Sequence, residues 1–226
     1  MKLKGIVFDF NGTLFLDSEI HQNTWFEIAN ELRDTPLTLE EYQEAGHGKT
    51  NDVFISYLLG ERPSDEKLNE IIERKEARYR QLCMDNPKDF KLAPGSIEFL
   101  NQVKKAGIKR TVATGAYERN VDFYFEHFSL SEWFDRSLVV FDDGLYPGKP
   151  EPYPYIRAAE KLGLTPESCI VFEDSMSGIQ SATLAGIGRV IAVEPSLDSE
   201  KLKALGGVHK ITNGFENLDL HELIQG

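Results

Sequence analysis

The sequence predicts an α/β fold in which a parallel sheet carries a separate helical insertion. Short, continuously apolar segments rich in β-branched residues recur along the chain and stop at carboxylates, glycine or proline, as buried parallel strands do. Segments of helical period lie between them, and this alternation favours a parallel sheet with right-handed crossovers. One long, charged stretch near the N-terminus lacks such apolar runs and interrupts the alternation.

Composition narrows the possible class of protein. The 226 residues, 41% of them hydrophobic, are enough to build and bury a core. The net charge of −12 opposes binding to phosphate backbones or anionic membranes, so we expect neither nucleic-acid nor membrane partners. Cys83 and Cys169 have no nearby Cys or His at metal-ligand spacing, which predicts a reduced, cytoplasmic protein without disulfides or zinc. A monomer is the default expectation, and the N-terminal apolar stretch, interrupted at Asp9, is too short for a signal peptide or a membrane span.

Five segments are expected to form the strands. Each runs into polar residues, glycine or proline: residues 5–10 before Gly12, 108–113 before Thr114, 137–141 before Asp142, 169–172 before Glu173, and 189–193 before Pro195. Because ligands in an open parallel sheet bind beyond the carboxyl ends of the strands, the polar residues at these ends are candidates for a site.

Helices are expected between these strands. Ile97, Leu100 and Val103, spaced by three, mark the first of them. The expected ranges are residues 95–106, 118–128, 152–162 and 177–185, with a closing helix within residues 213–226.

Residues 16–90 are expected to form the inserted helical domain. Its predicted helices cover residues 18–33, 39–45, 51–59 and 64–84, and Ser64 is a candidate N-cap of the last. Residues 14–17 and 87–94 are the expected linkers. One continuous α/β domain with a long helical excursion is the alternative.

Four polar residues from distant parts of the chain are expected at the same edge of the sheet. Asp9, Thr114, Lys149 and Asp174 each lie at a strand end or in the loop that follows it. Two carboxylates suit a hard cation, while a hydroxyl and an ammonium group suit a phosphate. This combination predicts a metal-assisted phosphoryl-transfer site.

The order of these motifs resembles that of the haloacid dehalogenase superfamily, and most of all its β-phosphoglucomutase-like phosphatases. The matching residues are Asp9-Phe10-Asn11-Gly12-Thr13, Thr114-Gly115, Lys149-Pro150 and Glu173-Asp174, with Ser177-Gly178 following. The resemblance covers essentially the whole chain. It implies a Rossmann-like, three-layer α/β core of residues 1–15 and 91–226, and an all-α cap domain of residues 16–90.

The resemblance also implies a role for each motif. Asp9 would be the nucleophile that forms an aspartyl-phosphate. Thr114, the amides from Gly115 onward and Lys149 would hold the transferred phosphate. Mg²⁺ would be bound by Asp9, Asp174 and the backbone carbonyl of Asn11, with Glu173 supporting from nearby. The implied substrate is a small phosphorylated metabolite, most readily a sugar phosphate, and both phosphatase and mutase activity remain open.

Asn11 departs from the family pattern. The family's phosphatases and mutases carry aspartate here, which protonates the leaving oxygen, whereas an amide cannot transfer that proton. A general acid–base residue supplies about 10²–10⁴-fold in rate, so we expect ester turnover to be impaired to that extent. Three explanations stay open: an engineered change, a natural protein with a different reaction, or a binding protein without turnover.

Three residues of the expected cap are candidate substrate contacts. By the resemblance, His21 would couple substrate binding to acid–base positioning, and Lys75 would contact the substrate. Lys49 occupies the position of a phosphate-binding arginine in β-phosphoglucomutase and of a Schiff-base lysine in phosphonoacetaldehyde hydrolase. Cleavage of a phosphonate C–P bond through Lys49 is therefore an alternative reaction, and solvated surface positions are the alternative for His21 and Lys75.

Overall fold

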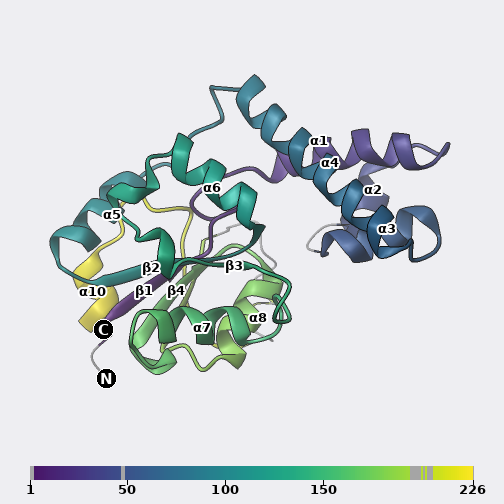
Figure 1. The fold of residues 1–226 in the computed structure, drawn as a ribbon. Helices are drawn as coiled ribbons and strands as arrows, with labels where there is room; N and C mark the ends of the chain where they lie inside the picture. The colour runs from purple at the N-terminus through teal and green to yellow at the C-terminus, as the bar shows by residue number, and fades with distance from the viewer. Residues whose placement is uncertain (1–2, 47–48, 194–199, 201, 203–205, 226) are drawn as a thin grey trace. The chain divides into compact units, whose positions relative to one another are not determined.

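The computed structural model describes residues 3–46, 49–193, 200, 202 and 206–225. The chain divides into two compact units, one of Met1–Leu16 and Lys91–Gly226 and the other of Asp17–Phe90. The first unit is α/β and the second is helical (Figure 1). Among the described residues, no helix combines the length and the apolar character needed to cross a membrane.

A parallel sheet forms the centre of the α/β unit, which confirms the predicted fold class. Its strand order is β3-β2-β1-β4-β5-β6, and every neighbouring pair is parallel. The strands are β1 (Gly5–Phe8), β2 (Lys109–Tyr117), β3 (Val140–Asp142), β4 (Cys169–Glu173), β5 (Arg189–Ala192) and β6 (Val208–Ile211). The helices of this unit are α5 (Ser96–Lys105), α6 (Glu118–His127), α7 (Tyr153–Lys161), α8 (Met176–Leu184) and α10 (Leu220–Gln225).

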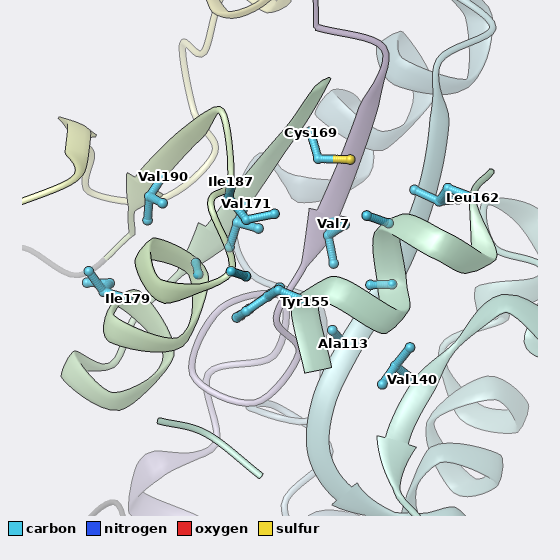
Figure 2. Close-up of a cluster of buried hydrophobic side chains, with 14 of the residues drawn as sticks. Val7, Ala113, Val140, Tyr155, Leu162, Cys169, Val171, Ile179, Ile187 and Val190 are labelled. Carbon is cyan, nitrogen blue, oxygen red and sulfur yellow. The ribbon is translucent and has the colours of Figure 1, made fainter. Parts of the chain in front are cut away.

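Helices α7 and α8 cover one face of the sheet. Val7, Val171 and Val190 point from the central strands into a cluster with Tyr155 of α7 and Ile179 of α8 (Figure 2). All five side chains are buried. Because successive strand residues point to opposite faces, the neighbours of Val7 are buried on the other side.

The other face of the sheet is covered by an aromatic cluster. Phe8 stacks on Phe172 with ring centroids 5.2 Å apart, and Phe99 of α5 meets both rings edge-on. Phe215 and Phe134 complete the cluster. Burial of β1 on both faces explains why its sequence is continuously apolar rather than alternating.

Two strand predictions differ from the structure, and one strand was not predicted. The expected strand at residues 108–113 continues to Tyr117 after a shift in its register with β3. Residues 136–138 form a short 3₁₀ turn instead of the start of β3, because the Asp135 carboxylate accepts hydrogen bonds from the Ser137 amide and hydroxyl. The edge strand β6 was not predicted, since its short Val-His-Lys-Ile sequence has too few apolar residues to stand out.

Parts of the two expected linkers pack against each other. Leu14 and Phe15 are buried, Phe15 pairs with Leu92 in an antiparallel bridge, and the Ala93 amide donates to the Leu14 carbonyl at 2.8 Å. The apolar character of Leu14 and Phe15 explains this packing. Residues 14–15 therefore belong to the α/β unit and are not a free linker.

The helical unit contains α1 (Ser18–Leu32), α2 (Leu39–Glu41), α3 (Asn51–Leu59) and α4 (Asp65–Asp85). Ser64 caps α4, as its hydroxyl accepts from the Lys67 amide at 3.3 Å. The expected helix at residues 39–45 is wrong in form, because α2 gives way to a π-helical turn, Tyr42–Gly46. A Cβ at Gly46 would lie 2.6 Å from the Phe54 ring, so this turn depends on a close approach of backbone to ring.

Candidate active site

Asp9 directly follows β1, an inner strand of the sheet, and is buried at the carboxyl end of that strand. Its amide donates to the Phe172 carbonyl of β4 at 2.9 Å, which extends the sheet pairing by one residue. Asp9 is only 5% exposed. A carboxylate at this position is shielded from water and lies at the carboxyl end of its strand, where ligands of open parallel sheets bind.

The loop after Asp9 turns sharply and faces Asp174. Gly12 has φ +83°, a left-handed conformation that side chains disfavour, and its amide donates to the Phe15 carbonyl at 2.7 Å. A Cβ at Gly12 would lie 2.0 Å from Asp174 Oδ2. The Thr13 hydroxyl donates to Asp174 Oδ1 at 3.1 Å, so the loop holds this carboxylate in place.

Replacing Gly12 with alanine is expected to displace Asp174 and to reduce Mg²⁺ binding. The left-handed φ adds about 1–2 kcal/mol of strain, and the Cβ contact adds a local clash that glycine avoids. Thermal unfolding with and without MgCl₂ measures both effects. Gly107→Ala is the matched control, because Gly107 has φ +66° and a Cβ added there would meet nothing within 4 Å. A full Mg²⁺ response in Gly12→Ala would contradict this role of the loop.

Lys149 bridges two of the carboxylates. Its Nζ donates to Asp9 Oδ1 at 2.6 Å, to Glu173 Oε1 at 2.5 Å and to the Ala113 carbonyl at 3.2 Å. Burial alone would lower the pKa of Lys149, but the charges of Asp9 and Glu173 outweigh it and raise that pKa. Lys149 therefore stays protonated and neutralises one of the negative charges at this edge.

Glu173 is fully buried and uses both oxygens within the protein. Oε1 also accepts from the Tyr155 hydroxyl at 2.8 Å, and Oε2 accepts from the Ser175 amide at 2.9 Å and its hydroxyl at 3.0 Å. Ser175 in turn caps α8 by accepting from the Gly178 amide. Glu173 thus holds Lys149 and the start of the loop that carries Asp174.

The carboxylates of Asp9, Glu173 and Asp174 are crowded together. One oxygen from each lies within 4.8 Å of the others, and the only cation that pairs with them among the described residues is Lys149. Burial, and then the charge of Glu173, raise the pKa of Asp9 to about 7 against the opposing attraction of Lys149. Burial and the neighbouring carboxylates also raise the pKa of Asp174 well above its usual range.

This donor set fits a divalent cation. Asp9 Oδ2 is buried and has no hydrogen-bond partner among the described residues, which is costly for a carboxylate oxygen unless something binds it. Hard carboxylate oxygens are the ligands that Mg²⁺ prefers, and the excess negative charge favours its binding.

Thr114 and Asn11 lie side by side at the same edge. The Thr114 hydroxyl donates to Asn11 Oδ1 at 3.1 Å and accepts from the Ala116 amide at 3.1 Å. Asn11 Nδ2 donates to the Tyr124 hydroxyl at 2.8 Å. Gly115 is exposed within β2, with open space around it.

The expected cap residues lie in the helical unit, where His21 and Lys75 belong to one polar network that is buried except at His21, whose side chain is 26% exposed. Lys75 Nζ donates to Glu76 Oε1 at 2.9 Å and contacts His21 Nδ1 at 3.3 Å. Since an ammonium group only donates, Nδ1 accepts, and Nε2 carries the proton that faces Asp17 Oδ2 at 3.2 Å. Lys49 is exposed, and among the described residues its side chain has no hydrogen bond to this group of polar side chains.

Replacing Lys75 with methionine is expected to destabilise the helical unit by about 3–5 kcal/mol, because it leaves the buried Glu76 carboxylate without its cation. Burial raises the pKa of Glu76, but Lys75, His21 and Asn51 outweigh it and lower that pKa to about 2. The pair therefore stabilises the fold above pH 4.5 and loses this contribution as the pH falls toward 2. Urea unfolding of the intact chain at pH 7 measures the loss. The double variant Lys75→Met/Glu76→Gln should recover most of it, and equal losses in both variants would contradict the explanation.

Three residues of this edge were not expected from the sequence: Tyr124, Tyr155 and Ser175. Tyr155 and Ser175 each follow a motif residue by a few positions, so the start of a helix after a motif is a usable signal for them. Tyr124 lies on the buried face of α6, where its spacing is that of an ordinary core residue. Nothing in the local sequence distinguishes it.

Comparisons with known proteins identify the family. The family model of haloacid dehalogenase-like hydrolases matches residues 3–186. A phosphorylated carbohydrates phosphatase of Thermotoga maritima is 31% identical over 86% of this chain and 95% of that protein. The crystal structure of a HAD hydrolase of family IA, variant 3, from Entamoeba histolytica superposes with a TM-score of 0.91 at 35% identity, over 98% of each chain.

A second solved structure includes a ligand. It is a mutant of CbbY from Rhodobacter sphaeroides in complex with xylulose-(1,5)bisphosphate, with a TM-score of 0.80 at 27% identity over 96% of each chain. This family match is consistent with the structure, which has a parallel sheet with a cluster of carboxylates at its edge. The chain belongs to the haloacid dehalogenase-like hydrolase family.

Proposed function

We propose that this hydrolase transfers the phosphoryl group of a small phosphorylated sugar through Asp9, with Mg²⁺ as cofactor. The observation that carries the proposal is the state of the Asp9 carboxylate. One oxygen is held by Lys149, and the other is buried without a hydrogen-bond partner among the described residues, beside Asp174. A carboxylate so placed is available to a metal and to phosphorus and is shielded from bulk water.

The proposed reaction has two steps on this carboxylate. In the first, an Asp9 oxygen forms a bond to phosphorus, the ester P–O bond breaks, and the leaving oxygen takes a proton from water, because Asn11 has none to transfer. In the second, water attacks phosphorus, the P–O bond to Asp9 breaks and water gives up a proton to solvent, which releases phosphate and restores Asp9. Lys149 and the Thr114 hydroxyl stabilise the charge on the phosphoryl oxygens. A mutase would use a sugar hydroxyl in place of water.

Asp9, Asp174 and the backbone carbonyl of Asn11 would hold Mg²⁺. When bound, the ion supplies charge neutralisation at the transferred phosphoryl group. Glu173 supports this site without being a direct ligand, since both of its oxygens already accept hydrogen bonds from Lys149, Tyr155 and Ser175. This assignment refines the expected role of Glu173.

The proposed substrate class rests on the relatives. The similar Thermotoga maritima protein is a phosphorylated carbohydrates phosphatase, and the similar CbbY structure contains a sugar bisphosphate. His21, Lys75 and Lys49 of the helical unit are the proposed substrate contacts. The buried, unpaired thiols of Cys83 and Cys169 fit a reducing compartment, so we propose the cytoplasm as its location.

A second candidate function rests on Asn11. Its amide has no transferable proton, so a phosphometabolite-binding protein without turnover has a specific observation in its favour. Phosphonate cleavage through Lys49 has less support. A Schiff-base lysine is activated by a desolvated pocket, whereas the Lys49 side chain is exposed.

The test is release of inorganic phosphate from a panel of sugar phosphates, an aryl phosphate and a phosphonate, with Mg²⁺ and with EDTA. We expect slow release from the esters that EDTA abolishes, and none from the phosphonate. Mg²⁺-independent release would contradict the metal role. Inactivation by borohydride in the presence of the phosphonate would instead support chemistry at Lys49.

A further inference from the structure

The Asn11 side chain is held at both ends by groups of the α/β unit. Its Oδ1 accepts from the Thr114 hydroxyl at 3.1 Å, and its Nδ2 donates to the Tyr124 hydroxyl at 2.8 Å. These two bonds use opposite ends of the planar amide. They therefore fix its orientation as well as its position.

Tyr124 is a rigid anchor. Its ring is 1% exposed and stacks on Phe10 with centroids 4.5 Å apart. Phe15 and Phe128 surround the same ring at 6.2 Å and 6.4 Å. Because a close-packed aromatic cluster cannot shift without opening a void, the hydroxyl is a fixed point beside residue 11.

Thr114 is a different kind of partner, because it has a single hydroxyl proton to donate. Its oxygen accepts from the Ala116 amide, and its proton goes to Asn11 Oδ1. A phosphate bound at Thr114 would compete for that one proton. Donation to the phosphate would end the Thr114 bond to residue 11.

We propose that Tyr124 is the positioning residue of residue 11, holding this side chain when the Thr114 hydroxyl turns from residue 11 to a bound phosphate. The inference rests on the proposed function, in which Thr114 binds the transferred phosphate. Arrival of the phosphate thereby releases one end of residue 11, while Tyr124 keeps the other end at the site.

The kinetic test uses the Asn11→Asp background, where residue 11 can transfer a proton and the Tyr124 hydroxyl can donate to its carboxylate. Adding Tyr124→Phe is expected to lower kcat about tenfold, the scale of one hydrogen bond, with KM and inhibition by inorganic phosphate unchanged. The matched control is Phe128→Leu, which disturbs the same aromatic cluster but keeps the hydroxyl. It should lower the melting temperature and leave kcat unchanged.

A second readout needs no turnover. The side-chain amide signal of Asn11 in a ¹H–¹⁵N spectrum, assigned by its loss in Asn11→Asp, should move in Tyr124→Phe and also on titration of inorganic phosphate with Mg²⁺. An unmoved signal in Tyr124→Phe would overturn the proposal, as would a matching fall in kcat in Phe128→Leu. If Asn11→Asp gains no turnover, the proposed function fails, and the amide signal still decides the role of Tyr124.

Discussion

Replacing Asn11 with aspartate is expected to raise Mg²⁺-dependent turnover of sugar phosphates by about 10²-fold or more. The gain is that of a general acid–base residue placed beside the leaving oxygen. The surroundings of residue 11 accept either side chain. The Thr114 hydroxyl donates to one oxygen, and the Tyr124 hydroxyl, which accepts from the amide, can donate to a carboxylate. The exchange therefore adds a transferable proton, keeps the bond from Thr114 and reverses the bond with Tyr124, whose hydroxyl becomes the donor.

Release of inorganic phosphate from the panel of sugar phosphates measures this gain. Asn11→Ser is the matched control, since it removes the amide without adding a carboxyl group and should give no gain. The opposite result is also informative. An Asn11→Asp variant that binds Mg²⁺ and phosphate but turns over no ester would favour the binding function over the hydrolase.

Replacing Asp9 with asparagine in the Asn11→Asp background is expected to lower turnover by about 10³-fold or more, because an amide does not attack phosphorus. The same change should leave the metal-free protein as stable as before or more so. It removes one of three crowded, buried carboxylates, and Lys149 keeps its bond to Glu173. The rise in melting temperature on adding MgCl₂ should shrink, because Asp9 is a proposed ligand.

The measurements are phosphate release and thermal unfolding with and without MgCl₂. Asp122→Asn is the matched control, since this carboxylate is largely exposed and pairs with Arg136. It should change neither turnover nor the Mg²⁺ response. Retention of turnover in the Asp9 variant would remove Asp9 from the nucleophilic role.

The sequence predicts the main features of the site because a parallel sheet brings strand ends together. Asp9 and Glu173 each stand at the carboxyl end of an apolar run, and these runs become the adjacent strands β1 and β4. Lys149 lies in the loop that follows β3, so the same reasoning places it at this edge, and the order of the motifs implies its role.

Features set by packing between distant segments could not be predicted. Tyr124 reaches Asn11 across 113 positions of the chain, and its spacing on α6 is that of any core residue. The edge strand β6 pairs on one side only, and its Val-His-Lys-Ile sequence is apolar only at its two ends, so its apolar signal is short. The π-helical turn at Tyr42–Gly46 depends on the Phe54 ring from another helix. In each case a tertiary contact outweighs local propensity.

The bridge between Phe15 and Leu92 bears on chain entropy. It brings together the two points where the chain leaves the α/β unit and returns to it. For the stability of the α/β unit, the insertion therefore counts as a loop whose ends are already joined. The cost of closing a flexible loop grows only with the logarithm of its length, by about 0.6 kcal/mol for each doubling. Insertions of very different size could therefore be exchanged at this junction at little cost to the sheet.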